Sequence, residues 1–153
     1  MSLNILKDNT NIVGHEKLKQ NFEHFQTIIA EANKHQIPSN TKEKINTIIK
    51  DFNNSTATDK KLLAEMRAAE RKVIDTLAKE AKLVPQNYHA ALWLILGMVS
   101  FGFPFGALLA LLNNNLGLIG LGLPIGMIIG AFIGKRLDNK AAIEGRQLNV
   151  KLA

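Results

Sequence analysis

The sequence contains no cysteine among its 153 residues. This absence excludes thiol nucleophiles, zinc sites built from thiolates and disulfide bonds, and it makes the chain indifferent to the redox state of its compartment. The sequence also lacks a phosphate-binding loop, a dinucleotide fingerprint and the spacing of a catalytic triad. We therefore expect no enzymatic activity and no cofactor.

A metal site is not expected either. His15 and His24, the histidines with acidic neighbours, lie nine residues apart and so face opposite sides of a helix.

Charged side chains are absent from residues 90–134, a run of 45 residues. The mean hydropathy of the whole chain, +0.02, hides this run because a polar first half offsets an apolar second half. An uncharged block of this length is too long for an exposed segment, and its length suits two membrane crossings joined by a turn. The sequence therefore predicts an integral membrane protein.

The two predicted spans are residues 90–112 and 116–134, separated by three asparagines. At a rise of about 1.5 Å per residue they are roughly 34 and 28 Å long, enough to cross a hydrocarbon core of about 30 Å. A turn this short predicts an antiparallel helical hairpin. Tyr88 and Trp93 lie where interfacial aromatic residues are expected.

Basic residues flank the hairpin on both sides, whereas the turn carries no charge. The flanking residues used for this assignment are Lys79 and Lys82 before the spans, and Lys135, Arg136 and Lys140 after them. By the positive-inside rule, both termini are predicted to be cytoplasmic and the asparagines to face outward. The chain has no basic start followed by an apolar stretch, so we expect no cleavable signal peptide.

Glycines recur every fourth residue in the second span, at Gly122, Gly126, Gly130 and Gly134. The first span has a shorter version of this pattern, with Gly102, Gly106 and Ala110. Small residues at this spacing let helices approach closely in a bilayer, where burying apolar surface brings little gain.

Folding the hairpin about Asn114 predicts which residues face each other. Gly106 is then opposite Gly122, and Gly102 is opposite Gly126. The same register places Met98 and Leu94 opposite the two remaining glycines of the second span. A second set of small residues gathers on nearly the opposite side of that span and is available for contact with another subunit: Gly117, Gly120, Pro124 and Ala131.

The first half of the chain predicts three amphipathic helices, over about residues 14–35, a short stretch after Pro38, and about residues 59–84. Each has one apolar stripe at spacings of three and four. Three such helices can close into a small bundle, although a domain of this size is marginal alone. Pairing with another copy or with a partner helix is the alternative.

Together these patterns predict an all-α protein with three parts. Residues 1–85 form a cytoplasmic three-helix head, residues 86–134 form a two-helix transmembrane hairpin, and residues 135–153 form a basic cytoplasmic tail. The net charge of +6 is divided between the two polar ends. So small an excess disfavours a nucleic-acid partner, which needs clustered basic residues.

The stretch from Gly122 to Lys140, with Glu144-Gly-Arg-Gln-Leu148 after it, resembles the small glycine-zipper membrane proteins of bacteria, most of which have no assigned function. The resemblance covers about the last 60 residues. It implies a two-span protein of the bacterial inner membrane and implies no activity.

The leading hypothesis is a non-enzymatic inner-membrane protein whose hairpin anchors, and oligomerises, a head that binds a protein partner. One alternative is a holin-like or toxin-like pore former, because two spans with both ends inside and a basic tail suit such proteins. Another is a structural protein of a virus-borne membrane. The expected partners are the lipid bilayer, a second copy of the chain, and a protein bound by the head whose identity the sequence does not give.

Overall fold

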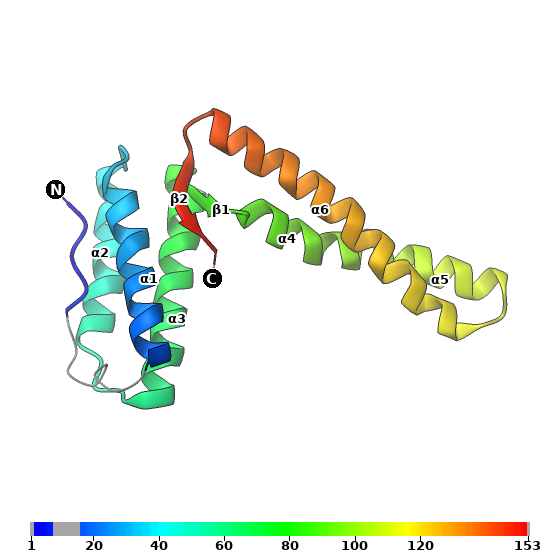
Figure 1. Ribbon diagram of the computed structural model, residues 1–153, viewed down its shortest axis with the longest axis horizontal. Coiled ribbons are helices and arrows are strands. Elements are labelled where there is room, and N and C mark those ends of the chain that lie inside the picture. The colour runs from blue at the N-terminus through cyan, green and yellow to red at the C-terminus, as the bar shows by residue number, and fades with distance from the viewer. Residues whose placement is uncertain (1, 8–15, 153) are drawn as a thin grey trace. The chain divides into compact units, whose positions relative to one another are not determined.

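The computed structural model describes residues 2–7 and 16–152. It confirms the predicted fold class, since three helices of a head are followed by two long apolar helices (Figure 1). The chain divides into two units. The head comprises Met1–Pro85 and Leu148–Lys151, and the hairpin comprises Gln86–Gln147 with Leu152.

The head is built from α1 (Glu16–Asn33), α2 (Ser39–Asn53) and α3 (Asp59–Thr76), which lie side by side (Figure 1). The predicted stripe of α1 is buried as a whole, and His15, which the sequence placed in this helix, lies outside the described residues. Burial of the stripes keeps the helices together, because isolated helices of this length are marginal in water. The largest fully buried apolar side chains of the three helices are Phe25, Ile28, Ile45, Ile49, Leu62, Met66 and Val73.

The third helix does not continue to residue 84 as predicted. It passes into a π-helical turn, η2 (Leu77–Ala81), and ends at Lys82, whose φ of 55° is left-handed. Strand β1 (Val84–Gln86) follows and pairs with β2 (Gln147–Lys151) in a two-stranded sheet. Pro85 is fully buried in β1.

Both ends of the chain complete the core of the head. Leu3 and Leu6 are each 3% exposed, and Leu148 and Val150 of β2 are 0% and 6% exposed. The three helical stripes alone are narrow, so these four side chains add apolar contact that the helices do not supply. Neither end has a long periodic pattern in the sequence, so this contribution to the core was not predicted.

A histidine and a buried glutamate join α1, α3 and β2. Nδ1 of His24 lies 3.2 Å from Oε1 of Glu70, and Nε2 of His24 lies 2.9 Å from the main-chain carbonyl oxygen of Lys151. Burial raises the pKa of the Glu70 carboxyl, and the charges of His24 and neighbouring arginines oppose that rise. Ionised Glu70 therefore costs folding free energy that protonated Glu70 does not.

We predict that Glu70→Gln changes how the stability of the head depends on pH. Because the folded pKa of Glu70 lies above its ordinary value of 4.5, the folded head binds this proton more tightly than the unfolded chain does. The resulting stabilisation is present below pH 4.5 and is lost as the pH rises through the folded pKa. As the pH rises from 4.5 through the folded pKa, the free energy of unfolding of the wild type should fall relative to that of Glu70→Gln. Urea unfolding of the full chain in micelles measures both. Parallel curves for the two proteins would contradict the assignment.

The hairpin is built from two long helices that lie side by side (Figure 1). The first runs over Tyr88–Leu112 and comprises α4 (Tyr88–Gly97), the π-helical turn η3 (Met98–Gly102) and α5 (Phe103–Leu112). The second runs over Leu116–Ile143 and comprises the 3-10 turn η4 (Leu116–Leu118) and α6 (Ile119–Ile143).

The second helix extends beyond the predicted span and into the predicted tail. The sequence placed the end of the span at residue 134 and a separate basic tail at 135–153, whereas α6 continues to Ile143 and residues 147–151 form β2. The helix ends where Gly145 takes a left-handed φ of 66° and the N–H of Arg146 donates to the carbonyl oxygen of Ala141 at 2.9 Å. This is a Schellman cap, which glycine accommodates without steric cost.

The three asparagines between the helices form the predicted turn, and two of them cap the adjoining helices. Asn114 has a left-handed φ of 50°, and the N–H of Asn115 donates to the carbonyl oxygen of Ala110 at 3.0 Å, which is again a Schellman cap. The side-chain oxygen of Asn115 then accepts the N–H of Gly117 at 3.0 Å, which caps the second helix. The asparagines therefore end one helix and start the next.

Candidate functional site

The two helices of the hairpin meet along an interface of glycines. Gly102 and Gly106 of the first helix and the four glycines of the second that recur every fourth residue are all buried. A methyl group added at Gly122 would lie 2.6 Å from Cα of Gly106, and one added at Gly126 would lie 2.6 Å from Cα of Gly102. Real side chains do not approach main-chain atoms this closely, so the contact requires glycine on both helices.

Gly97 also belongs to this interface, and the sequence analysis did not include it. A methyl group at Gly97 would lie 2.6 Å from Cα of Gly130. Gly97 is five residues before Gly102, a spacing that would leave it off the glycine face of a regular α-helix. The π-helical turn η3 includes one extra residue per turn and brings Gly97 onto that face.

The same turn changes the predicted register at the end of the hairpin away from the asparagine turn. The sequence placed Met98 and Leu94 opposite Gly130 and Gly134. In the structure, Gly130 instead faces the main chain at Trp93 and Gly97, and a methyl group at Gly134 would lie 2.5 Å from Cα of Ala90. The simple pairing about Asn114 therefore holds only between the turn and η3.

The second set of small residues faces away from the first helix. Gly117, Gly120 and Pro124 are exposed, and Ala131 is partly exposed. A methyl group added at Gly120 would meet no atom within 4 Å. This face is accessible in the single chain, and its use by a second copy stays a prediction.

We predict opposite effects for alanine at two glycines of α6. Gly126→Ala should destabilise the hairpin by about 1–3 kcal/mol, because the added methyl group overlaps the main chain of the first helix. Gly120→Ala is the matched control and should be neutral or stabilise by up to about 1 kcal/mol, because alanine is the better helix former and the site is open.

The single tryptophan, Trp93, lies on the first helix and reports unfolding by its fluorescence during denaturant titration in mild detergent. Equal losses at Gly120 and Gly126 would contradict the interface.

A buried carboxylate caps the start of the hairpin. Asp138 of α6 is 5% exposed, and its two oxygens accept the main-chain N–H groups of His89 and Ala90, each at 2.9 Å. These N–H groups belong to the first turn of α4 and have no partner within the helix. The residue at the ordinary capping position, Asn87, makes no side-chain cap, so Asp138 supplies it from the other helix.

We predict that Asp138→Ala destabilises the hairpin by about 2 kcal/mol, because it leaves two partly buried N–H groups unpaired. Asp138→Asn keeps an acceptor oxygen and should cost less. Asn139→Ala, at the exposed neighbouring position, is the control and should change little. The same fluorescence titration measures all three, and an Asp138→Ala protein as stable as the wild type would contradict the capping role.

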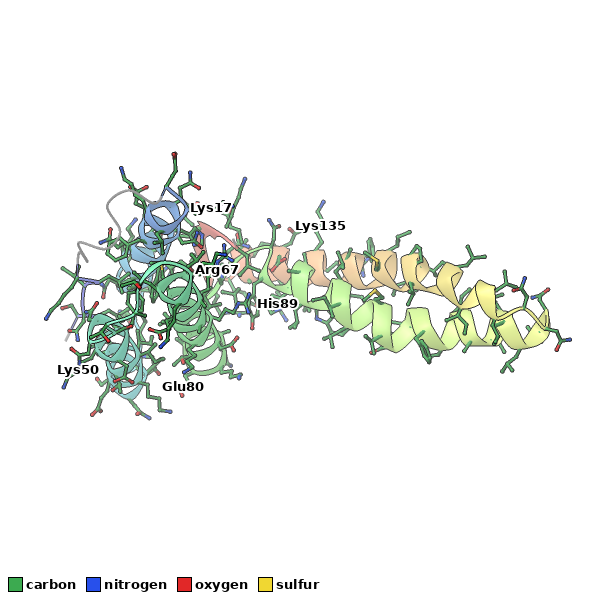
Figure 2. All side chains as sticks on the ribbon, turned by 90° about the horizontal axis from the view of Figure 1, so that it is seen from below. Lys17, Lys50, Arg67, Glu80, His89 and Lys135 are labelled. Atoms are coloured by element: carbon green, nitrogen blue, oxygen red, sulfur yellow. The ribbon has the colours of Figure 1, made fainter. Side chains whose placement is uncertain are left out.

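The basic residues that the sequence used for topology are exposed. Lys79 lies in η2 and Lys82 follows it in the head, whereas Lys135, Arg136 and Lys140 lie on α6. Lys135 lies at the same end of the hairpin as His89, the end away from the asparagine turn (Figure 2).

The guanidinium of Arg136 sits 4.5 Å from the ring centroid of Phe132, a cation–π contact between the last apolar turn of α6 and its first charged one.

No group of three or more His, Asp or Glu side chains within residues 2–7 and 16–152 is placed to hold a metal ion. In the head, an open recess of about 230 Å³ lies between α2 and α3, with Ile48 and Phe52 on one side and Ala68 and Ala69 on the other. Comparison with protein-family models, curated proteins and solved structures gives no match. The resemblance to glycine-zipper proteins therefore stays a prediction.

Proposed function

We propose that the chain is a non-enzymatic integral membrane protein, in which the glycine-packed hairpin anchors a helical head that binds a protein partner. The proposed location is the bacterial inner membrane, with the head and both termini in the cytoplasm. The observation that carries the proposal is the contrast between the two sides of the hairpin helices.

The inner side of each hairpin helix carries glycine and the outer side carries large apolar residues. Exposed side chains on the outer side include Leu92, Ile95, Val99, Phe103, Leu108, Leu121, Ile128 and Phe132, all more than 40% exposed. In water this surface would drive aggregation, because exposed apolar patches of this extent are not left uncovered in soluble proteins. Lipid chains cover it without cost, and the close main-chain contact then holds the two helices together.

The main-chain hydrogen bonding of the hairpin also suits a bilayer. The turn and the helix ends are capped, and the uncharged residues 90–134 place no ionisable group inside the spans. An ionisable or polar path is what transporters and proton relays use, so the hairpin is better suited to anchoring than to transport. A pore would need further copies, because the two helices of one chain touch directly along the glycines.

The charge distribution supports the proposed orientation. Exposed lysines and an arginine lie at the end of α6 and after α3, and the turn at residues 113–115 carries only asparagine. Basic residues are retained on the cytoplasmic side during insertion. β2 follows the hairpin and belongs to the head unit. This agrees with a chain that enters the membrane and returns from it on the same side.

The absence of cysteine allows a direct test of this topology with single-cysteine variants. Asn114→Cys in the turn should react with a membrane-impermeant maleimide in intact spheroplasts. Lys50→Cys on the exposed surface of α2 should react only after the membrane is opened (Figure 2). The wild type, which has no thiol, is the control for background labelling. Reaction of both variants from the same side would contradict a spanning hairpin.

A further inference from the structure

Residues 2–7 lie against the head as an extended segment held by asparagine side chains. The amide of Asn46 on α2 makes two bonds to the segment: its oxygen accepts the N–H of Asn4 at 2.7 Å, and its nitrogen donates to the carbonyl oxygen of Ser2 at 3.4 Å. Asn46 is 7% exposed, so both bonds are shielded from water. One side chain thus hydrogen-bonds to both a donor and an acceptor of the segment's main chain.

Asn53 repeats this arrangement two helical turns later. Its oxygen accepts the N–H of Lys7 at 3.0 Å, and its nitrogen donates to the carbonyl oxygen of Ile5 at 3.2 Å. Asn33 of α1 adds a fifth bond, since its oxygen accepts the N–H of Leu3 at 2.9 Å. The bonds described use main-chain atoms of the segment, so none depends on the identity of its side chains.

The repeat of the asparagines matches the repeat of an extended peptide. Asn46 and Asn53 are seven residues apart on α2, which corresponds to a rise of about 10.5 Å. The N–H groups they bind belong to Asn4 and Lys7, three residues apart, and three residues of a polyproline II chain span about 9.3 Å. The spacing of the two asparagine side chains along α2 therefore nearly equals the spacing of the main-chain N–H groups that they bind.

The side chains of the segment follow the same period of three. Leu3 and Leu6 are each 3% exposed, whereas Ile5 between them is 77% exposed. Two apolar anchors three residues apart, with polar or exposed residues elsewhere, are a typical specificity pattern for an extended peptide in a groove. The main-chain bonds supply affinity, and the two buried leucines supply the preference for apolar side chains.

We propose that Asn33, Asn46 and Asn53 line a peptide-binding groove for an extended segment of a partner protein, and that residues 2–7 are its intramolecular occupant. The partner segment carries two apolar side chains three residues apart, and it has no proline at the positions equivalent to 3, 4 and 7, whose N–H groups are bound. It competes with residues 2–7 for the groove. The inference rests on the proposed function, in which the head binds a protein, and it names the surface and the chemistry of that partner.

The test uses the full chain in mild detergent and a fluorescein-labelled peptide with the sequence of residues 2–7. Leu3→Asp/Leu6→Asp should empty the groove in cis, and this protein should bind the peptide at least tenfold more tightly than the wild type does, by fluorescence anisotropy. An unrelated hexapeptide that keeps apolar residues at its second and fifth positions should bind within tenfold of the first. A peptide with aspartate at both of those positions should not bind.

Groove substitutions provide the matched controls. Adding Asn46→Leu and Asn53→Leu to the double variant should weaken peptide binding at least tenfold, whereas adding Asn40→Leu, on the exposed first turn of the same helix, should not. A second protein lacking residues 2–7 should bind the peptide as the double variant does. Far-UV circular dichroism checks that the helices remain folded.

Three results would overturn the proposal. The first is no saturable binding by either variant while the helical signal is retained. The second is loss of that signal in both variants, which would make residues 2–7 an obligatory part of the fold. The third is a wild-type dimer that Leu3→Asp/Leu6→Asp dissociates, which would assign the groove to a second copy. All three results come from measurements on the purified protein. The anchoring function is tested independently, by cysteine labelling in cells, so failure of one proposal does not imply failure of the other.

Discussion

Contact between two main chains is the interaction on which the hairpin depends. Its two helices approach so closely that a methyl group added at an interface position would overlap the main chain of the other helix, and only glycine allows this approach. Gly97, Gly102 and Gly106 on one helix therefore have to match the glycines on the other. The π-helical turn at Met98–Gly102 makes this match possible, because it returns a misaligned glycine to the shared face. The extra residue in that turn thus has a packing role.

The head depends on a different kind of contact, because its helices are short and pack through buried apolar side chains. Their apolar stripes are closed by both ends of the chain, with Leu3 and Leu6 from one end and Leu148 and Val150 from the other. The two ends are held in different ways. β2 pairs with β1, whereas residues 2–7 are held by asparagine side chains and make no strand. A segment held by side-chain amides can leave while the main-chain bonds of the helices stay intact, and this difference motivates the proposed groove.

Local patterns predicted much of this architecture. The period of the apolar residues located the three head helices, and the run without charge located the hairpin and its asparagine turn, because both signals depend only on neighbours in sequence. The features that were missed depend on residues distant in sequence. Asp138 caps a helix that starts about fifty residues earlier, Asn46 binds residues 2–4, and Gly97 joins the interface only through a π-helical turn. No periodic pattern marks any of these contacts.

The register of the glycine interface is the claim that most directly tests this account. Solid-state NMR of the full chain in lipid bilayers, with ¹³C only at glycine Cα, would report which glycines of the two helices are in contact. The account predicts cross-peaks between Gly106 and Gly122, Gly102 and Gly126, and Gly97 and Gly130, the last being specific to the π-helical turn. Absence of all three, or contact of Gly97 with none of the glycines on α6, would contradict it.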